Sequence, residues 1–152
     1  MKVCIGGTFD IIHKGHELLI NKAFEIAGEN GTVFIGVTKD DLIKNKKGTR
    51  SFPYRKKSIK EFLEKKGLIA NVIIKPIKDK FGLTIDEDFD VIIVSPETYK
   101  TAEEINKIRE KTEKKPIEIV KIPFVLADDG KPISSTRIRS GEIDIEGRNI
   151  AD

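Results

Sequence analysis

Short runs of apolar residues alternate along the chain with longer stretches in which apolar residues recur every third or fourth position. The first pattern is typical of strands covered on both faces, and the second of helices packed on one side. The runs predict strands at residues 3–5, 32–37, 72–74, 89–94 and 116–122. The periodic stretches predict helices over about residues 15–29, 55–66 and 95–114, with Ser95 as N-cap before Pro96 in the third, and a short last helix opening at residues 133–136.

Strands that alternate with helices predict the α/β class, here a single-domain, doubly wound, five-stranded parallel sheet. A length of 152 residues suits one domain spanning residues 1–152. Ligands of such sheets bind at the carboxyl ends of the strands. These ends are expected at residues 6–10, 37–47, 95–98 and 128–139, so the candidate site lies along one rim.

Composition narrows the partners of the chain. Apolar residues make up 38% and charged residues 35% of the chain, and the net charge is only +3. The lysines are interspersed with glutamates, so nucleic acid is not an expected partner. No apolar run has the length of a membrane span and the N-terminus lacks a signal-peptide pattern, so no membrane partner is expected and the expected compartment is the cytoplasm. The one cysteine, Cys4, lies in the first apolar run and is expected to be a small core residue.

The first strand leads into Gly6 and Gly7, and His13 and His16 follow at the start of the first helix. Glycines let a ligand approach the backbone, and a helix start favours an anion, so this junction predicts a phosphate site. The histidines alone also fit a cap and a packing residue, or metal ligands. No cysteine or carboxylate at ligand spacing joins them, which argues against zinc, and the adjacent glycines favour the anion.

A second polar cluster opens the last predicted helix, where Ser134, Ser135 and Thr136 precede Arg137 and Arg139. One hydroxyl there would simply cap the helix, whereas three in succession with arginines behind them favour a second phosphate site. Residues two apart on a helix diverge, so the two arginines cannot both face one phosphate. Neither the dinucleotide fingerprint GxGxxG nor the phosphate loop GxxxxGK[ST] is present at the glycine turn, which argues against dinucleotide binding and ATP hydrolysis.

Residues 6–16, GGTFDIIHKGH, resemble the T/HxGH signature of the nucleotidylyltransferase superfamily once the extra glycine is allowed for. Residues 133–139, ISSTRIR, resemble its second signature. The two resemblances together imply the Rossmann-like fold of that superfamily. Class I tRNA synthetases share a related histidine motif, but this chain is too short to hold their other domains.

Within the superfamily, the chain most resembles the phosphopantetheine adenylyltransferase family of archaeal and eukaryotic type. The segments VSPET at residues 94–98 and GEID at residues 141–144 carry this resemblance, with Asn106 and Arg109. It implies transfer of AMP from ATP to 4′-phosphopantetheine, giving dephospho-coenzyme A and pyrophosphate. The alternatives are an FMN acceptor, as in archaeal FAD synthetases, a glycerol-3-phosphate cytidylyltransferase, and a nucleotide-binding module without catalysis.

The resemblance also implies roles for single residues. His16 is the expected catalytic donor to the α-phosphate. The second expected catalytic residue is a lysine of residues 44–47 that joins Thr8 at the acceptor phosphate, with Lys46 as the first candidate and Lys44 as the second. The expected acceptor-binding residues are Thr8, Lys44, Lys46 and Arg109. The expected ATP-binding residues are Gly6, Gly7, Thr8, Phe9, His13, His16, Ser134, Ser135, Thr136 and Arg139. Magnesium is expected to arrive on the ATP phosphates and not at a protein metal site, and Asp10, Asp128 and Asp129 are expected to be turn or cap residues.

Overall fold

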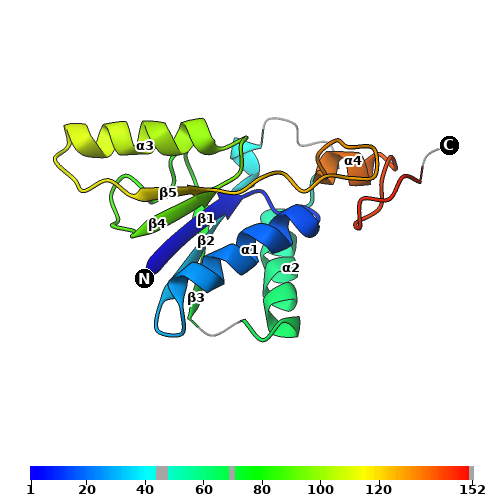
Figure 1. Cartoon of the computed structure of the whole chain (residues 1–152), viewed down its shortest axis with the longest axis horizontal. Coiled ribbons are helices and arrows are strands. Elements are labelled where there is room, and N and C mark those ends of the chain that lie inside the picture. The colour runs from blue at the N-terminus through cyan, green and yellow to red at the C-terminus, as the bar shows by residue number, and fades with distance from the viewer. Residues whose placement is uncertain (44–47, 69–70, 151–152) are drawn as a thin grey trace.

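The computed structural model describes residues 1–43, 48–68 and 71–150 and contains a parallel five-stranded sheet (Figure 1). The strands are β1 (Lys2–Gly7), β2 (Thr32–Thr38), β3 (Val72–Ile77), β4 (Val91–Val94) and β5 (Glu118–Lys121), in the order β3-β2-β1-β4-β5. Every pair of neighbouring strands is parallel. The predicted α/β doubly wound sheet is therefore confirmed, and β1 is its central strand.

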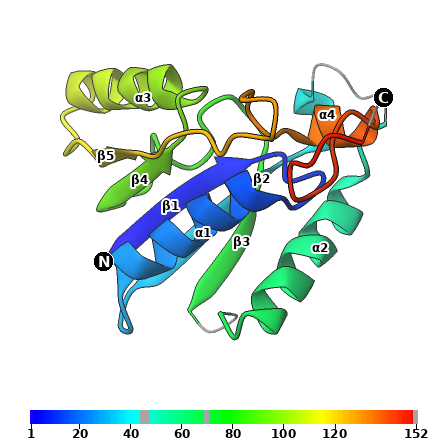
Figure 2. The ribbon, with the colours of Figure 1, turned by 45° about the vertical axis from the view of Figure 1, so that its right-hand side comes forward.

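Helices cover both faces of this sheet. Helices α1 (Lys14–Ala27) and α2 (Phe52–Lys65) lie on one face and α3 (Tyr99–Lys111) lies on the other (Figures 1 and 2). The 3-10 helix η1 (Asp40–Leu42) and the short α4 (Ser135–Arg139) lie beyond the carboxyl ends of the strands. No helix in the described ranges is both long and apolar enough to cross a bilayer.

The core follows from the alternation of side chains along the inner strands. Buried residues of β1 and β2 meet buried residues of α1 and α2, namely Val3, Ile5, Val33, Ile35, Val37, Ile20, Ala23, Ile59 and Leu63. On the other face, Phe34 of β2 meets Phe89 edge to face, with ring centroids 5.2 Å apart. Because β1 is covered on both faces and paired on both edges, the turn that follows it starts from a rigid support.

Two helix starts differ from the predicted ones. Ser95 was the expected N-cap of the third helix, but the cap is Thr98. Ser95 N–H donates to Thr98 Oγ1 (3.2 Å) and Thr98 N–H donates to the Ser95 carbonyl (3.1 Å), so residues 95–98 close a turn before the helix begins. In the second helix, Pro53 lies inside the first turn, where its missing N–H costs no hydrogen bond, so α2 begins at Phe52 and not at Arg55.

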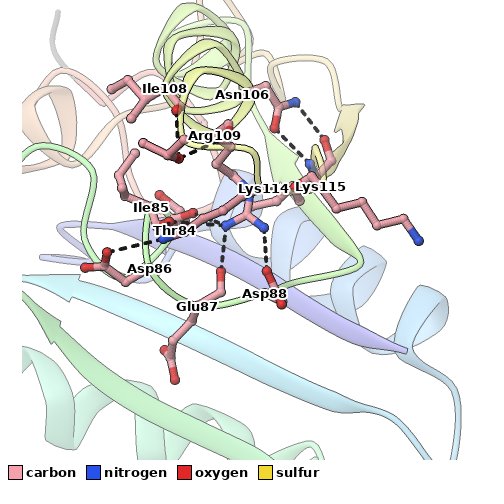
Figure 3. Close-up of polar contacts among 12 residues, drawn as sticks. Thr84, Ile85, Asp86, Glu87, Asp88, Asn106, Ile108, Arg109, Lys114 and Lys115 are labelled. Atoms are coloured by element: carbon pink, nitrogen blue, oxygen red, sulfur yellow. Dashed lines mark hydrogen bonds and ion pairs between the residues drawn. The ribbon is translucent and has the colours of Figure 1, made fainter.

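Arg109 lies at the amino ends of the strands, at the end of the sheet opposite the predicted rim. Its assignment to the acceptor is therefore wrong, because the side chain is far from the predicted site. Its side chain, 1% exposed, donates to the carbonyls of Thr84 (2.9 Å), Glu87 (2.9 Å) and Lys115 (2.7 Å), and it pairs with the Asp88 carboxylate (2.6 Å) (Figure 3). These partners precede β4 and β5 in the chain, and so lie at the amino ends of those strands. Arg109 therefore fastens the irregular segment between β3 and β4 to α3.

Replacing Arg109 by methionine should lower the free energy of unfolding by about 2–4 kcal/mol, because buried carbonyls lose their donor. Urea unfolding followed by circular dichroism measures this. Asp88→Asn is the matched control, since the Asp88 side chain is exposed and only one bond to Arg109 changes. Equal effects of the two variants would contradict the anchoring role of the buried guanidinium.

Candidate active site

The turn after β1 is built around a buried aromatic ring. Phe9 adopts a left-handed backbone conformation with φ 52° and is 1% exposed. A Cβ on Gly7 would lie 3.2 Å from the Phe9 ring, and a Cβ on Gly6 would lie 3.3 Å from Ile77 Cδ1. The glycines therefore let the Phe9 ring and the Ile77 side chain of β3 pack closely against the backbone. Phe9, predicted to bind ATP, supports the turn from the core instead of facing solvent.

His13 and His16 close the start of α1 on each other. His13 is the N-cap, and its Nδ1 accepts from the Gly15 N–H (3.0 Å), while the His13 N–H donates to Nδ1 of His16 (3.3 Å). The two rings stack with centroids 3.9 Å apart. A Cβ on Gly15 would lie 2.8 Å from His13 Cε1, so any residue larger than glycine at position 15 would displace the His13 ring that caps the helix. The capping and the functional interpretation of the sequence are therefore compatible.

The protonation state of both rings follows from these contacts. Each Nδ1 accepts from a backbone N–H, so the neutral imidazole carries its proton on Nε2. Burial lowers the pKa of His13 to about 4. Burial is the main cause that lowers the pKa of His16 to about 3, and the neighbouring His13 lowers it further. A hydrogen bond with the Ile11 backbone raises this pKa but does not offset the other two causes. At neutral pH the unliganded site therefore has two uncharged N–H donors.

Helix α4 is tied directly to this turn. The Ser135 hydroxyl accepts from the Ile11 N–H and donates to the Ile11 carbonyl, both at 3.2 Å. Ser134 is the N-cap and accepts from the Arg137 N–H (3.2 Å). The two predicted phosphate-binding segments, 124 positions apart for Ser135 and Ile11, are thus adjacent in space.

Asp10 connects the same two segments through charge. Its carboxylate, 3% exposed, pairs with Nη1 of Arg139 and accepts from the Arg50 N–H (2.8 Å). Arg139 also donates to Thr136 Oγ1 (3.4 Å). Arg137 points elsewhere, to Asp129 and Glu142, as expected for arginines two apart on a helix. Asp10 was predicted to be only a turn or cap residue, whereas its carboxylate orients the arginine predicted to bind phosphate.

Arg55 is a second residue whose role the sequence motifs do not reveal. Its side chain is fully buried, and its three nitrogens donate to the Arg50 carbonyl, the Thr8 carbonyl and Asp40 Oδ1, each at 2.8 Å. A signal for this burial exists in the sequence, because Ile59 and Leu63 follow Arg55 at a spacing of four and share its face of α2.

A cleft of about 350 Å³ opens beside α4, a size within the range of small-molecule sites. It lies between the turn after β4 and the start of α4, and its lining mixes apolar surface with two polar residues. The lining residues are Pro96, Glu97, Phe124, Pro132, Ile133 and Ser134. The cleft thus adjoins the N-cap of α4. It lies next to residues 8–13, which connect β1 to α1 and which we call the histidine turn.

Comparison with known proteins identifies the family. A family model described as cytidylyltransferase-like matches residues 4–141. The phosphopantetheine adenylyltransferase of Methanosarcina mazei is 51% identical to this chain, covering 97% of this chain and 96% of that protein. The corresponding protein of Archaeoglobus fulgidus is 43% identical and covers 97% and 98%. The chain belongs to the phosphopantetheine adenylyltransferase family.

A solved structure agrees with this assignment at the level of the fold. The crystal structure of a protein of unknown function from Archaeoglobus fulgidus has a TM-score of 0.71 and 38% identity, and covers 80% of this chain and 89% of that one. The predicted superfamily and its Rossmann-like fold are therefore confirmed.

The structure brings most of the predicted site together at one rim. The two segments that Ser135 and Asp10 join carry seven of the predicted residues, namely Thr8, His13, His16, Ser134, Ser135, Thr136 and Arg139. Lys44 and Lys46 lie outside the described residues. Their flanking residues Asp40 and Arg50 both contact Arg55, beside Thr8.

Changing Gly15 to alanine should displace the His13 ring without a large loss of stability. Alanine adds about 1 kcal/mol of helix propensity, which offsets the weakened cap. The ring-nitrogen NMR signals of His13 should shift, while Asn21→Ala, an exposed change in the same helix, should leave them in place. An unchanged His13 spectrum would contradict the steric requirement for Gly15.

Stability should fall as the pH is lowered from about 6.5 toward about 4. The unfolded chain has the ordinary histidine pKa of 6.5 and binds protons that the folded chain, with the pKa of His13 lowered to about 4, does not bind. Urea unfolding at a series of pH values gives the proton uptake. At about pH 5, His16→Asn should take up about one proton fewer than the wild type on unfolding, and equal uptake would contradict the lowered pKa of His16.

Proposed function

We propose that this protein transfers AMP from ATP to 4′-phosphopantetheine, releasing pyrophosphate and forming dephospho-coenzyme A. The observation that carries the proposal is the joining of the histidine turn to α4 through Ser135 and Asp10, in a chain 51% identical to a phosphopantetheine adenylyltransferase. One site at the carboxyl ends of the strands then holds a triphosphate along α4 and the histidines. The cleft beside Ser134 offers room for the nucleoside.

The chemistry needs donors and no general base. The terminal phosphate of the acceptor is already an anion, and its oxygen attacks the α-phosphorus of ATP while the bond to pyrophosphate breaks. Negative charge accumulates on the transferring and leaving phosphates, so positioned N–H donors stabilise the transition state. In this proposal, His16 donates from Nε2 to the α-phosphate. His13, the start of α4 and Arg139 hold the β- and γ-phosphates.

Neutral histidines suit this role. A ring that is uncharged before ATP binds needs no carboxylate partner, so no such partner holds it away from the substrate. The backbone hydrogen bond accepted by Nδ1 fixes the proton on Nε2. An approaching polyphosphate raises the pKa of a nearby imidazole, so charge can develop where the phosphates lie. Arg139, by contrast, brings a permanent charge that Asp10 keeps in place.

The acceptor is assigned to the side of the turn that carries Thr8, because the lysine candidates lie between Asp40 and Arg50 in the sequence. Thr8 would contact the acceptor phosphate or bridge it to ATP, and Lys46, with Lys44 as second candidate, would neutralise it. The position of Thr8 beside Asp40 and Arg50, which flank the lysines, supports this side.

Magnesium is proposed to enter with ATP and to be held by its phosphates. In the described residues no three histidine, cysteine or carboxylate side chains gather into a metal site, and the Asp10 carboxylate is engaged by Arg139 and Arg50. When bound, the ion withdraws charge from the leaving pyrophosphate. The reaction so described needs small molecules only, without nucleic acid or membrane, and we place it in the cytoplasm, where ATP is available.

The decisive experiment compares acceptors. Pyrophosphate release from ATP should be fastest with 4′-phosphopantetheine and much slower with FMN, NMN or, using CTP, glycerol 3-phosphate. Faster release with FMN would replace the proposed acceptor, and ATP binding without release would favour the non-catalytic module.

His16→Ala should lower kcat about a hundredfold or more while ATP affinity changes little, because a transition-state donor is lost.

A further inference from the structure

Arg55 is a charged side chain in the core beneath the predicted rim. It is fully buried, on the face of α2 that also carries Ile59 and Leu63. Burying a guanidinium is costly unless its donors are satisfied. Here one planar group binds three acceptors from three separate segments: the Thr8 carbonyl after β1, Asp40 in η1 and the Arg50 carbonyl before α2.

The geometry of an arginine fork explains why this position holds arginine. Nε, Nη1 and Nη2 diverge in one plane, and each donates to a different acceptor at 2.8 Å. A lysine ammonium is a single point charge and cannot reach three acceptors arranged around a fork. The guanidinium therefore fixes the relative positions of Thr8, Asp40 and Arg50.

These three acceptors all belong to the acceptor side of the proposed site. Thr8 is the residue assigned to the junction of the two substrates, and Asp40 and Arg50 flank residues 44–47 in the sequence. The Arg50 N–H also donates to Asp10, whose other oxygen pairs with Arg139 of α4. A continuous set of polar contacts thus runs from Arg55 through Arg50 and Asp10 to the triphosphate side.

We propose that Arg55 is a positioning residue for adenylyl transfer. It touches no substrate, and it holds Thr8, Asp40 and Arg50 in the arrangement that the acceptor phosphate requires. The proposal rests on the proposed function for its substrates. Its structural part, the fixing of Thr8 and Arg50 by one guanidinium, does not depend on which acceptor is used.

Arg109 provides a matched control for the effect of losing a buried arginine. It is equally buried and binds backbone carbonyls and one exposed carboxylate, as Arg55 does, but it lies at the amino ends of β4 and β5 (Figure 3). Arg55→Lys and Arg109→Lys therefore make the same chemical change at opposite ends of the strands. Asp40→Asn is a milder test, because the Asp40 side chain is half exposed and the two carbonyl contacts of Arg55 remain.

The first measurement is amide hydrogen exchange, which needs no substrate. In Arg55→Lys, the Arg50 N–H should exchange about tenfold faster or more, because its bond to Asp10 loses its support. In Arg109→Lys, the faster exchange should appear instead at Glu87 and Lys114, whose N–H groups bond next to that arginine. Arg50 exchange at the wild-type rate in Arg55→Lys would overturn the proposal.

The second measurement is steady-state kinetics well below the unfolding temperature of each variant. Arg55→Lys should raise KM for the acceptor about tenfold and lower kcat about tenfold, with ATP affinity within about twofold of wild type. Asp40→Asn should change the same parameters in the same direction by less, and Arg109→Lys should leave them unchanged. Equal kinetic losses in Arg55→Lys and Arg109→Lys would overturn the positioning role.

The two proposals fail differently. If wild-type protein does not use 4′-phosphopantetheine, the proposed function fails, and the exchange experiment still decides the role of Arg55. If wild type is active and Arg55→Lys matches it in acceptor KM, in kcat and in Arg50 exchange, only the positioning role is lost.

Discussion

The rest of the site depends on a buried carboxylate, that of Asp10, which is satisfied by a residue 129 positions away. An ionised group at this depth is tolerated only when it is paired and hydrogen-bonded, and Arg139 and the Arg50 N–H meet that need. Helix α4 has five residues and could not persist on its own. Its position is set by Asp10 and by Ser135, so the second signature is ordered by the first.

Two buried arginines divide the work of holding the segments around the sheet. Arg109 anchors the segment between β3 and β4, which contains no helix of its own, and so stabilises the fold. Arg55 fastens the turns at the opposite rim, where the substrates are proposed to bind. A buried arginine is thus structural at the amino ends of the strands, and it is tied to the proposed site at their carboxyl ends, because different segments lie beside it.

Much of the fold was readable from the sequence, since continuous apolar runs mark buried parallel strands and the helices carry clear periodicity. The third helix start was wrong because Ser95 and Pro96 also suit a turn, and only the Thr98 hydroxyl decides between the two. At the site, the histidines and the serines were found from their motifs. Arg109 was assigned to the acceptor from the family resemblance, Asp10 was predicted to be only a turn or cap residue, and Arg55 had no predicted role, because the motifs do not report which charged side chains are buried. Spacing with Ile59 and Leu63, and with Ala102 and Ile105, would have placed both arginines on buried faces.

The use of both Nδ1 atoms in the helix cap also affects how the histidines meet transition-metal ions. A zinc ion needs an unprotonated ring nitrogen, yet the Nδ1 lone pairs of His13 and His16 are occupied by backbone N–H groups and the protons lie on Nε2. Binding a metal through Nε2 would move the proton to Nδ1, where it would face another N–H and break the first turn of α1. Metal binding at these two histidines would therefore compete with the hydrogen bonds that begin the helix.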